Sequence, residues 1–252
     1  MIYQKLMESA SSLMNGLKVE DVRVGIGYTA VKNSAGGLGL AYTLREDLEC
    51  GCSHIPDAGS LGGRDLAEVA SYFSCRNNVI KTAIGLAAIN SVAPGGNGSG
   101  LSGDVLKVLD IRPDEWVGMI GHFAPIEKKI RQVTPHLFVI DRGKGYLRGN
   151  EFRVIQEILS SCKVLIITAT ALLNRTLEDI LQAGSRARTR VLLGPSTPLY
   201  PDVFSGHVEV LSGMVPGDKD HILQIVGQGG GTLHFGRHSH KVNILLKGNK
   251  NK

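Results

Sequence analysis

The sequence has no long apolar run, and it contains few cysteines. No apolar stretch reaches the roughly 18 residues that a membrane-spanning helix needs. The first residues include an acid, Glu8, and do not have the apolar centre of a signal peptide. We therefore expect no membrane contact. Four cysteines in 252 residues are too few for a disulfide framework, so we expect a reducing, cytoplasmic location.

Aromatic residues and charge of one sign are also scarce. The formal net charge is only +5, and the basic residues are scattered along the chain. Aromatic residues make up 5% of the sequence. Proteins that bind single-stranded nucleic acids interleave basic residues with aromatic side chains. We therefore expect no nucleic-acid partner. A hydrophobic content of 42% is sufficient for a substantial core.

The pattern of the chain changes near residue 112, which predicts two domains, residues 1–112 and 113–252. The first half predicts a smaller α+β domain with a helix at 1–17, strands at 22–31 and 38–43, and helices at 64–73 and 78–92. From residue 116 on, short apolar strands alternate with helices, and a hairpin through residues 233–246 closes the chain. This alternation predicts an α/β fold with a doubly wound, Rossmann-like parallel sheet.

Small polar residues follow two of the predicted buried strands. Thr168, Thr170 and Asn174 come at the end of one strand and just after it, and Gly194, Ser196 and Thr197 follow the next. Ligands of open α/β sheets bind outside the carboxyl ends of the strands, so these residues predict a small-molecule site. Hydroxyl groups that cap the following helix are the alternative.

The first strand–helix turn of this half matches a dinucleotide fingerprint only in part. Gly118 and Gly121 flank the end of the strand, and Asp141 ends the next strand about 20 residues later, where an acid binds a ribose hydroxyl. The third glycine of the fingerprint is missing, which argues against a classical dinucleotide. An adenosyl, purine- or pterin-like ligand stays open, because Asp141 needs only a ring or sugar donor.

Residues for nucleophilic catalysis are sparse. The sequence has no Gly-x-Ser-x-Gly elbow. His122, just after the first strand, is the candidate general base, and the alternative is a histidine bonded to backbone near a helix start. Whether the protein is an enzyme or a binding protein is left open.

Two clusters could bind metal directly. Cys50, Cys52 and His54 form one, but alternate residues of an extended strand lie roughly 6.6 Å apart. Thiolates on one zinc ion lie only about 4 Å apart, so a turn at Gly51 would be required. His234, His238 and His240 form the other cluster, on the predicted closing hairpin. The alternatives are unligated loop cysteines and a solvated hairpin tip.

Several segments together resemble a known family. They are residues 85–90, residues 117–123, which end with Phe123, residues 167–170 with 174–177, and residues 193–199 and 211–213. In this order they resemble the heavy-metal chelation family of bacterial and archaeal proteins. The resemblance implies an enolase N-terminal-like domain followed by a Rossmann-like domain. It also implies a pocket between them for flavin-, pterin- or siderophore-like molecules.

We expect the N-terminal domain to close over the strand ends and bring Thr29 and Asn90 into the cleft. Neutral hydrogen-bonding groups suit a planar heteroaromatic ring better than a triphosphate or a hard cation. The predicted partner is therefore a small heteroaromatic or metal-chelating molecule, without an assigned cofactor. A methyltransferase-like protein with an adenosyl cofactor and a direct Cys/His metal-binding protein are the alternative functions. A homodimer is left open.

Overall fold

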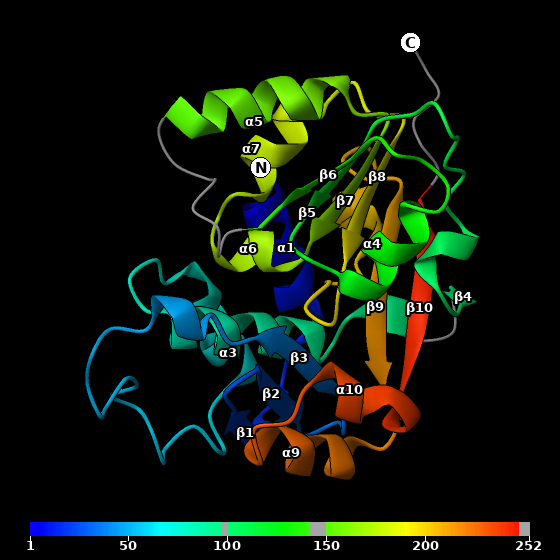
Figure 1. Ribbon diagram of the computed structural model, residues 1–252. Helices are drawn as coiled ribbons and strands as arrows, with labels where there is room; N and C mark the ends of the chain where they lie inside the picture. Colours follow the sequence, from blue (N-terminus) through cyan, green and yellow to red (C-terminus); the bar gives the residue numbers. More distant parts are fainter. Residues whose placement is uncertain (97–99, 142–149, 247–252) are drawn as a thin grey trace.

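The computed structural model describes residues 1–96, 100–141 and 150–246 and contains two β-sheets. Figure 1 shows the larger sheet in the upper part of the molecule and the smaller sheet below it. Among the described residues, no helix combines the length and the apolar character that a membrane span requires. The site described below lies where the two parts meet.

The smaller sheet is antiparallel, in the order β1 (Val19–Val24), β2 (Tyr28–Asn33), β3 (Leu38–Tyr42), and follows helix α1 (Ile2–Leu13). The single strand predicted over residues 22–31 is wrong, because the chain reverses there. Gly25 N donates to Tyr28 O at 2.9 Å and closes a turn between β1 and β2. The second turn was predicted, and the Asn33 side chain holds it by accepting from the N–H groups of Ala35 and Gly37.

Helix α3 is the central helix of this part and is buried on nearly all sides. Its small residues let other backbone segments approach closely. A Cβ atom at Gly39 would lie 2.0 Å from Ala87 O, so β3 touches α3 at a distance that only glycine allows. The helices and 3₁₀ turns of this part are η1 (Arg45–Asp47), α2 (Leu66–Ala70), η2 (Ser71–Ser74), α3 (Val79–Asn90) and η3 (Pro94–Gly96). The next turn, η4 (Val105–Lys107), packs on the larger sheet.

The larger sheet has the strand order β4-β10-β9-β8-β7-β5-β6. Strands β5 to β9 run parallel, and β10 and β4 add an antiparallel edge. The predicted α/β fold class is confirmed. The strands are β4 (Leu101–Ser102), β5 (Val117–Ile120), β6 (Leu137–Ile140), β7 (Val164–Thr168), β8 (Thr189–Leu193), β9 (Val210–Pro216) and β10 (Ser239–Leu245).

Helices cover both faces of this sheet, which explains why its strands are continuous apolar runs. Met119 and Ile166 point into the layer closed by α4 (Ala124–Ile130) and residues 105–111. Their neighbours Ile120 and Ile167 point into the opposite layer. That layer is closed by α5 (Asn150–Ser161) and α7 (Leu177–Ala183), and the short helices α6 (Thr170–Leu173) and α8 (Pro201–Phe204) follow β7 and β8.

A segment that connects two strands of the larger sheet packs against the smaller sheet. Helices α9 (Lys219–Gly227) and α10 (Thr232–Phe235) leave the larger sheet and pack on the smaller one, followed by η6 (Gly236–His238). Ile222, Val226 and Phe235 form one apolar cluster with Ala30 and Leu40.

Two details of the predicted organisation change in the structure. The predicted hairpin through residue 233 is wrong, since α10 occupies that position. Strand β4 precedes residue 112 but pairs with β10 in the larger sheet. The division of the chain at residue 112 stays a prediction.

Candidate functional site

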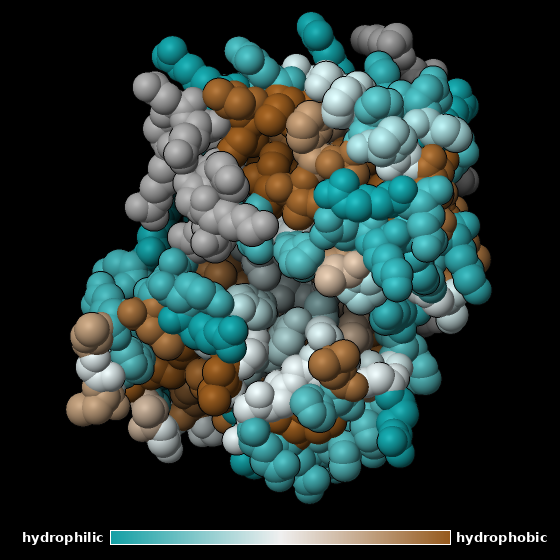
Figure 2. All heavy atoms as spheres, in the orientation of Figure 1, coloured by the Kyte–Doolittle hydropathy of each residue, from teal (hydrophilic) through white to brown (hydrophobic). Residues whose placement is uncertain are grey.

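The carboxyl ends of the parallel strands lie on one edge of the larger sheet. Ile120 is level with Ile140 and Ile167, and Thr168 is level with Leu193. The residues predicted to share this edge, Gly121, Asp141, Thr168 and Gly194, therefore do so. The edge faces the smaller sheet (Figure 1), and Figure 2 shows that the surface between the two parts is hollowed and of intermediate hydropathy.

The loop after β8 ties the two parts together. Ser196 is 2% exposed, and its Oγ accepts a hydrogen bond from Tyr42 N of β3 at 2.7 Å. Thr197 is 3% exposed, and its hydroxyl donates to Ser212 O of β9 at 3.1 Å. Gly194, at φ 125°, allows the turn that starts the loop. Both hydroxyl groups predicted to bind a ligand thus already have protein partners.

Asn90, the last residue of α3, lies against the same loop. Its Nδ2 donates to Leu40 O at 2.8 Å and to Ser196 O at 3.2 Å. Two carbonyl acceptors fix the orientation of the amide, because a flipped amide would set oxygen against oxygen. The other amide atom, Oδ1, is buried and has no hydrogen-bond partner among the described residues. A buried acceptor without a partner indicates space for a donor that the protein does not supply.

A cavity of about 310 Å³ lies beside Asn90. It is at the lower end of the range for small-molecule sites. Ten of its fourteen lining residues are glycine or apolar, and Lys219 is the only charged residue among the fourteen. The Lys219 Nζ donates to Gly36 O at 2.5 Å. The lining residues are Gly37, Leu38, Gly39, Leu40, Asn90, Ser91, Ala93, Pro195, Thr197, Leu199, Met214, Val215, Pro216 and Lys219.

The cavity is lined by β9, which lies on one side of β8 in the sheet. Strands β7, β5 and β6 lie on the other side of β8, so the predicted site residues that follow them are on the opposite side of the loop after β8. In chain order the parallel strands run 2-1-3-4-5, so the topological switch point lies between β5 and β7. Here a Cβ on Gly121 would lie 2.8 Å from the Thr168 side chain. The Thr168 and Thr170 hydroxyls bond each other at 3.0 Å. The switch point is therefore closely packed, and the cavity is displaced from it.

Asp141 is the acidic group of this side of the cleft. It directly follows β6 and is half-buried. Burial and the hydrogen bond from Tyr42 to Glu46 raise the pKa of the Tyr42 phenol, and the charge of Asp141 adds to this effect. Asp141 therefore lies close enough to β3 for its charge to act on Tyr42.

His122 lies on the surface after β5 and does not reach the cavity lining. Its Nε2 lies 2.8 Å from Glu127 Oε2 of α4. Hydrogen bonds from Arg131 and His122 lower the pKa of the Glu127 carboxyl, the one from Arg131 most, so this group stays ionised and orients the imidazole. Phe123 is half-buried and packs on the apolar layer beneath α4.

Two predicted ligand residues have local structural partners. Thr29 is fully buried in β2, and its hydroxyl bonds that of Thr43 at 3.0 Å. The Asn174 carbonyl oxygen accepts from the N–H and the hydroxyl of Thr176, which shapes the turn before α7. Neither residue lines the cavity.

The two candidate metal clusters of the sequence differ from the one possible cluster among the described residues. Within the described ranges, the only group of three potential ligand atoms within 4.8 Å of one another belongs to Asp218, His221 and His238. Neither Cys50, Cys52 and His54 nor the three predicted C-terminal histidines form such a group. The sequence patterns did not indicate Met214 and Lys219 as cavity residues, or Asp218 and His221 as members of a cluster. The Asp-x-x-His spacing at a helix start was the available signal.

Comparison with known proteins gives relatives without an assigned activity. An uncharacterised protein of Methanocaldococcus jannaschii is 25% identical over 226 residues, which cover 82% of this chain and 83% of that protein. A crystal structure of a DUF364-family protein of unknown function from Pyrococcus horikoshii is 24% identical, with a TM-score of 0.81 over 98% of this chain and 100% of that one. A second, from Desulfitobacterium hafniense, is 23% identical, with a TM-score of 0.76 over 97% and 100% of the two chains.

Family models match nearly the whole chain. The DUF4213 model matches residues 3–93 and the DUF364 model residues 104–245, and both carry the description "putative heavy-metal chelation". The resemblance inferred from the sequence motifs is confirmed. This chain belongs to the DUF364 family.

Proposed function

We propose that this protein binds a small heteroaromatic or metal-chelating molecule, of the flavin, pterin or siderophore class, in the cavity beside Asn90. The buried Asn90 Oδ1 without a partner carries this proposal. A ligand that offers an N–H or O–H group to this atom supplies its missing hydrogen bond. Leaving such an acceptor unpaired costs about 1–3 kcal/mol, so a matching donor gains affinity.

The rest of the cavity wall narrows the ligand class. Leu199, Met214 and Pro216 offer apolar surface for a flat ring. The Lys219 ammonium is held by one carbonyl, which leaves donors for an acceptor or a negatively charged oxygen of the ligand. Pterins and flavins combine ring N–H donors with carbonyl acceptors, and catecholate or hydroxamate chelators carry acidic oxygens. A triphosphate would call for more than one cationic side chain.

The test is a calorimetric titration of the protein with a panel of compounds: a pterin, a flavin, a catechol chelator and an adenosyl cofactor. The adenosyl compound represents the alternative function, in which Asp141 would bind a ribose hydroxyl. The variant Met214→Trp places a large side chain in the cavity and should lower affinity by at least ~10-fold, because a ring no longer fits beside it. Ser12→Trp is the matched control, since Ser12 lines a separate cavity of about 320 Å³.

The variant Lys219→Met tests whether the Lys219 ammonium binds a negatively charged oxygen of the ligand. It should weaken acidic members of the panel by roughly 10- to 100-fold, the value of one charge-assisted hydrogen bond, and leave neutral members almost unchanged. The proposal is wrong if no member binds the protein, or if Met214→Trp binds as tightly as Ser12→Trp. Loss of affinity in Asp141→Ala, with Met214→Trp unaffected, would place the ligand at the switch point instead.

A further inference from the structure

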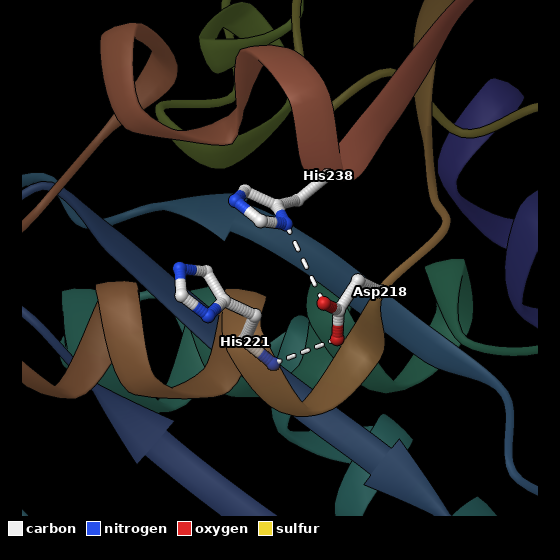
Figure 3. A group of neighbouring side chains, drawn as sticks. All are labelled: Asp218, His221 and His238. Atoms are coloured by element: carbon white, nitrogen blue, oxygen red, sulfur yellow. Dashed lines mark hydrogen bonds and ion pairs between the residues drawn. The ribbon is translucent and has the colours of Figure 1, made fainter.

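Three potential metal ligands meet where α9 begins and η6 ends (Figure 3). They are Asp218, His221 and His238, and one ligand atom from each lies within 4.8 Å of the others. The His221 and His238 rings stack with their centroids 4.0 Å apart. Asp218 Oδ2 lies 3.5 Å from His238 Nδ1. This group is outside the cavity lining and has no role in the ligand site proposed above.

The fold fixes these residues with respect to one another. Asp218 caps α9, since its Oδ1 accepts from His221 N at 3.1 Å, and this leaves Oδ2 for another partner. His238 comes from a different segment, and two hydrogen bonds hold its backbone against the start of α9. Gly217 N and Asp218 N both donate to His238 O, at 2.8 and 3.1 Å. The carboxylate and the two imidazoles are therefore brought together by backbone geometry and do not depend on a flexible loop.

Interactions within the protein explain this arrangement only in part. A separation of 3.5 Å is long for a charge-assisted hydrogen bond, which is normally 2.7–2.9 Å. The pairing is also partly solvated, because the Asp218 side chain is 56% exposed. Exposed ion pairs of this kind contribute little to stability. A cation between the three groups would use the carboxylate oxygen and both imidazoles at once.

We propose that Asp218, His221 and His238 form a binding site for a divalent transition-metal ion of the cobalt-to-zinc series. Two imidazole nitrogens and one carboxylate oxygen are a donor set that these ions prefer. Mg²⁺ and Ca²⁺ call for more oxygen ligands than this site has. Three protein ligands leave at least one coordination position open for water or for a chelating molecule.

Binding requires a small rearrangement that the exposed side chains permit. Ligand atoms on one tetrahedral zinc ion lie about 3.4 Å apart, since each Zn–N bond is near 2.0–2.1 Å. The ligand atoms now lie within 4.8 Å of one another, so the three groups must approach by at most about 1.4 Å. A metal also lies in the plane of an imidazole, so one of the two stacked rings must turn. His221 is exposed and is free to turn about its Cβ–Cγ bond.

The test uses the full chain without an affinity tag, treated with a chelator and then titrated with ZnCl₂ and, separately, with CoCl₂ in a calorimeter. One equivalent of metal should bind. His221→Ala and His238→Ala should each weaken metal binding by more than ~10-fold. Removing a residue that only orients a metal ligand already lowers metal affinity by about 10-fold or more, and removing the ligand itself should cost at least as much. His240→Ala is the matched control, an exposed histidine of the same segment outside the group, and should bind as the original chain does.

Two further measurements separate this site from other sources of metal binding. The variant Cys50→Ser/Cys52→Ser should bind zinc unchanged, which excludes the exposed thiols. In nitrogen-detected NMR spectra of the histidine rings, zinc should shift the signals of His221 and His238 and not that of His240. His221 is exposed, so its variant should keep the circular dichroism spectrum of the fold. The proposal is overturned if the original chain binds neither metal, or if His221→Ala/His238→Ala binds as tightly as His240→Ala.

Discussion

Replacement of Ser196 by alanine should destabilise the protein through the contact between its two parts. The Ser196 hydroxyl is the acceptor for Tyr42 N, on the free edge of β3, at 2.7 Å. Alanine cannot accept, and Ser196 is only 2% exposed, so little water reaches the vacated position. A buried N–H group left without a partner costs about 1–3 kcal/mol. We expect the free energy of unfolding to fall by that amount.

Urea denaturation followed by circular dichroism measures this change, and a melting curve provides a second measurement. For a chain of this length, each kcal/mol corresponds to roughly 2–4 °C, so the expected shift is about 2–12 °C. Ser12→Ala is the matched control, because its exposed hydroxyl bonds only Ser9 O within the same helix. It should stay within ~0.5 kcal/mol of the original chain.

One result would refute this reasoning. If Ser196→Ala is as stable as Ser12→Ala but binds a compound of the panel at least ~10-fold more weakly, Ser196 contacts the ligand and is not a structural tie. A loss of stability with unchanged ligand affinity supports a structural role for the Ser196 hydroxyl. The two measurements together therefore distinguish the structural role of the loop after β8 from the ligand-binding role that its sequence predicted.

Three other variants test separate parts of the fold. Arg175 has a φ of 63°, and its guanidinium lies over the rings of Tyr3 and Phe73. Arg175→Ala should be about 1 kcal/mol less stable to urea than Arg175→Gly, because alanine tolerates that φ poorly. Hydrogen bonds from Arg188 lower the pKa of Glu115, so this pair stabilises the fold above the ordinary glutamate pKa of about 4.3, and its contribution disappears as pH falls through the lowered value. The difference in melting temperature between the original chain and Glu115→Gln should therefore disappear when thermal unfolding is measured at acid pH. Gly39→Ala should lose about 3 kcal/mol or more and give little soluble protein, since its Cβ meets Ala87 O.

The larger sheet could be predicted because its signal is local and strong. Runs such as residues 164–167 are apolar without interruption, which is typical of strands covered on both faces. Once such strands are parallel, their carboxyl ends must share an edge, so the common position of Gly121 and Thr168 followed from the sequence. The smaller sheet was harder, since alternation of residues continues through the glycines at 25 and 27 and hides the turn between β1 and β2.

The use of polar side chains within the site could not be predicted in the same way. Ser196 accepts from Tyr42, which is 154 residues away in the sequence, and nothing near Ser196 indicates this partner. Thr29 was expected in the cleft but is paired in the interior of its own sheet. Asn90 was expected near Ser196 and contacts it. The meeting of His221 with His238 depends on how η6 packs against α9, which local patterns do not encode.

The position of α9 and α10 constrains the order in which the molecule can be assembled. During synthesis the smaller sheet leaves the ribosome first, but Ala30 and Leu40 face residues 222–235, which are made about 190 residues later. Until then one face of that sheet stays open to solvent, and contacts of such long sequence separation form slowly. The N-terminal half therefore cannot complete its core as an early, independent unit. Residues 222–235, near the end of the sequence, complete the core of the part that is synthesised first.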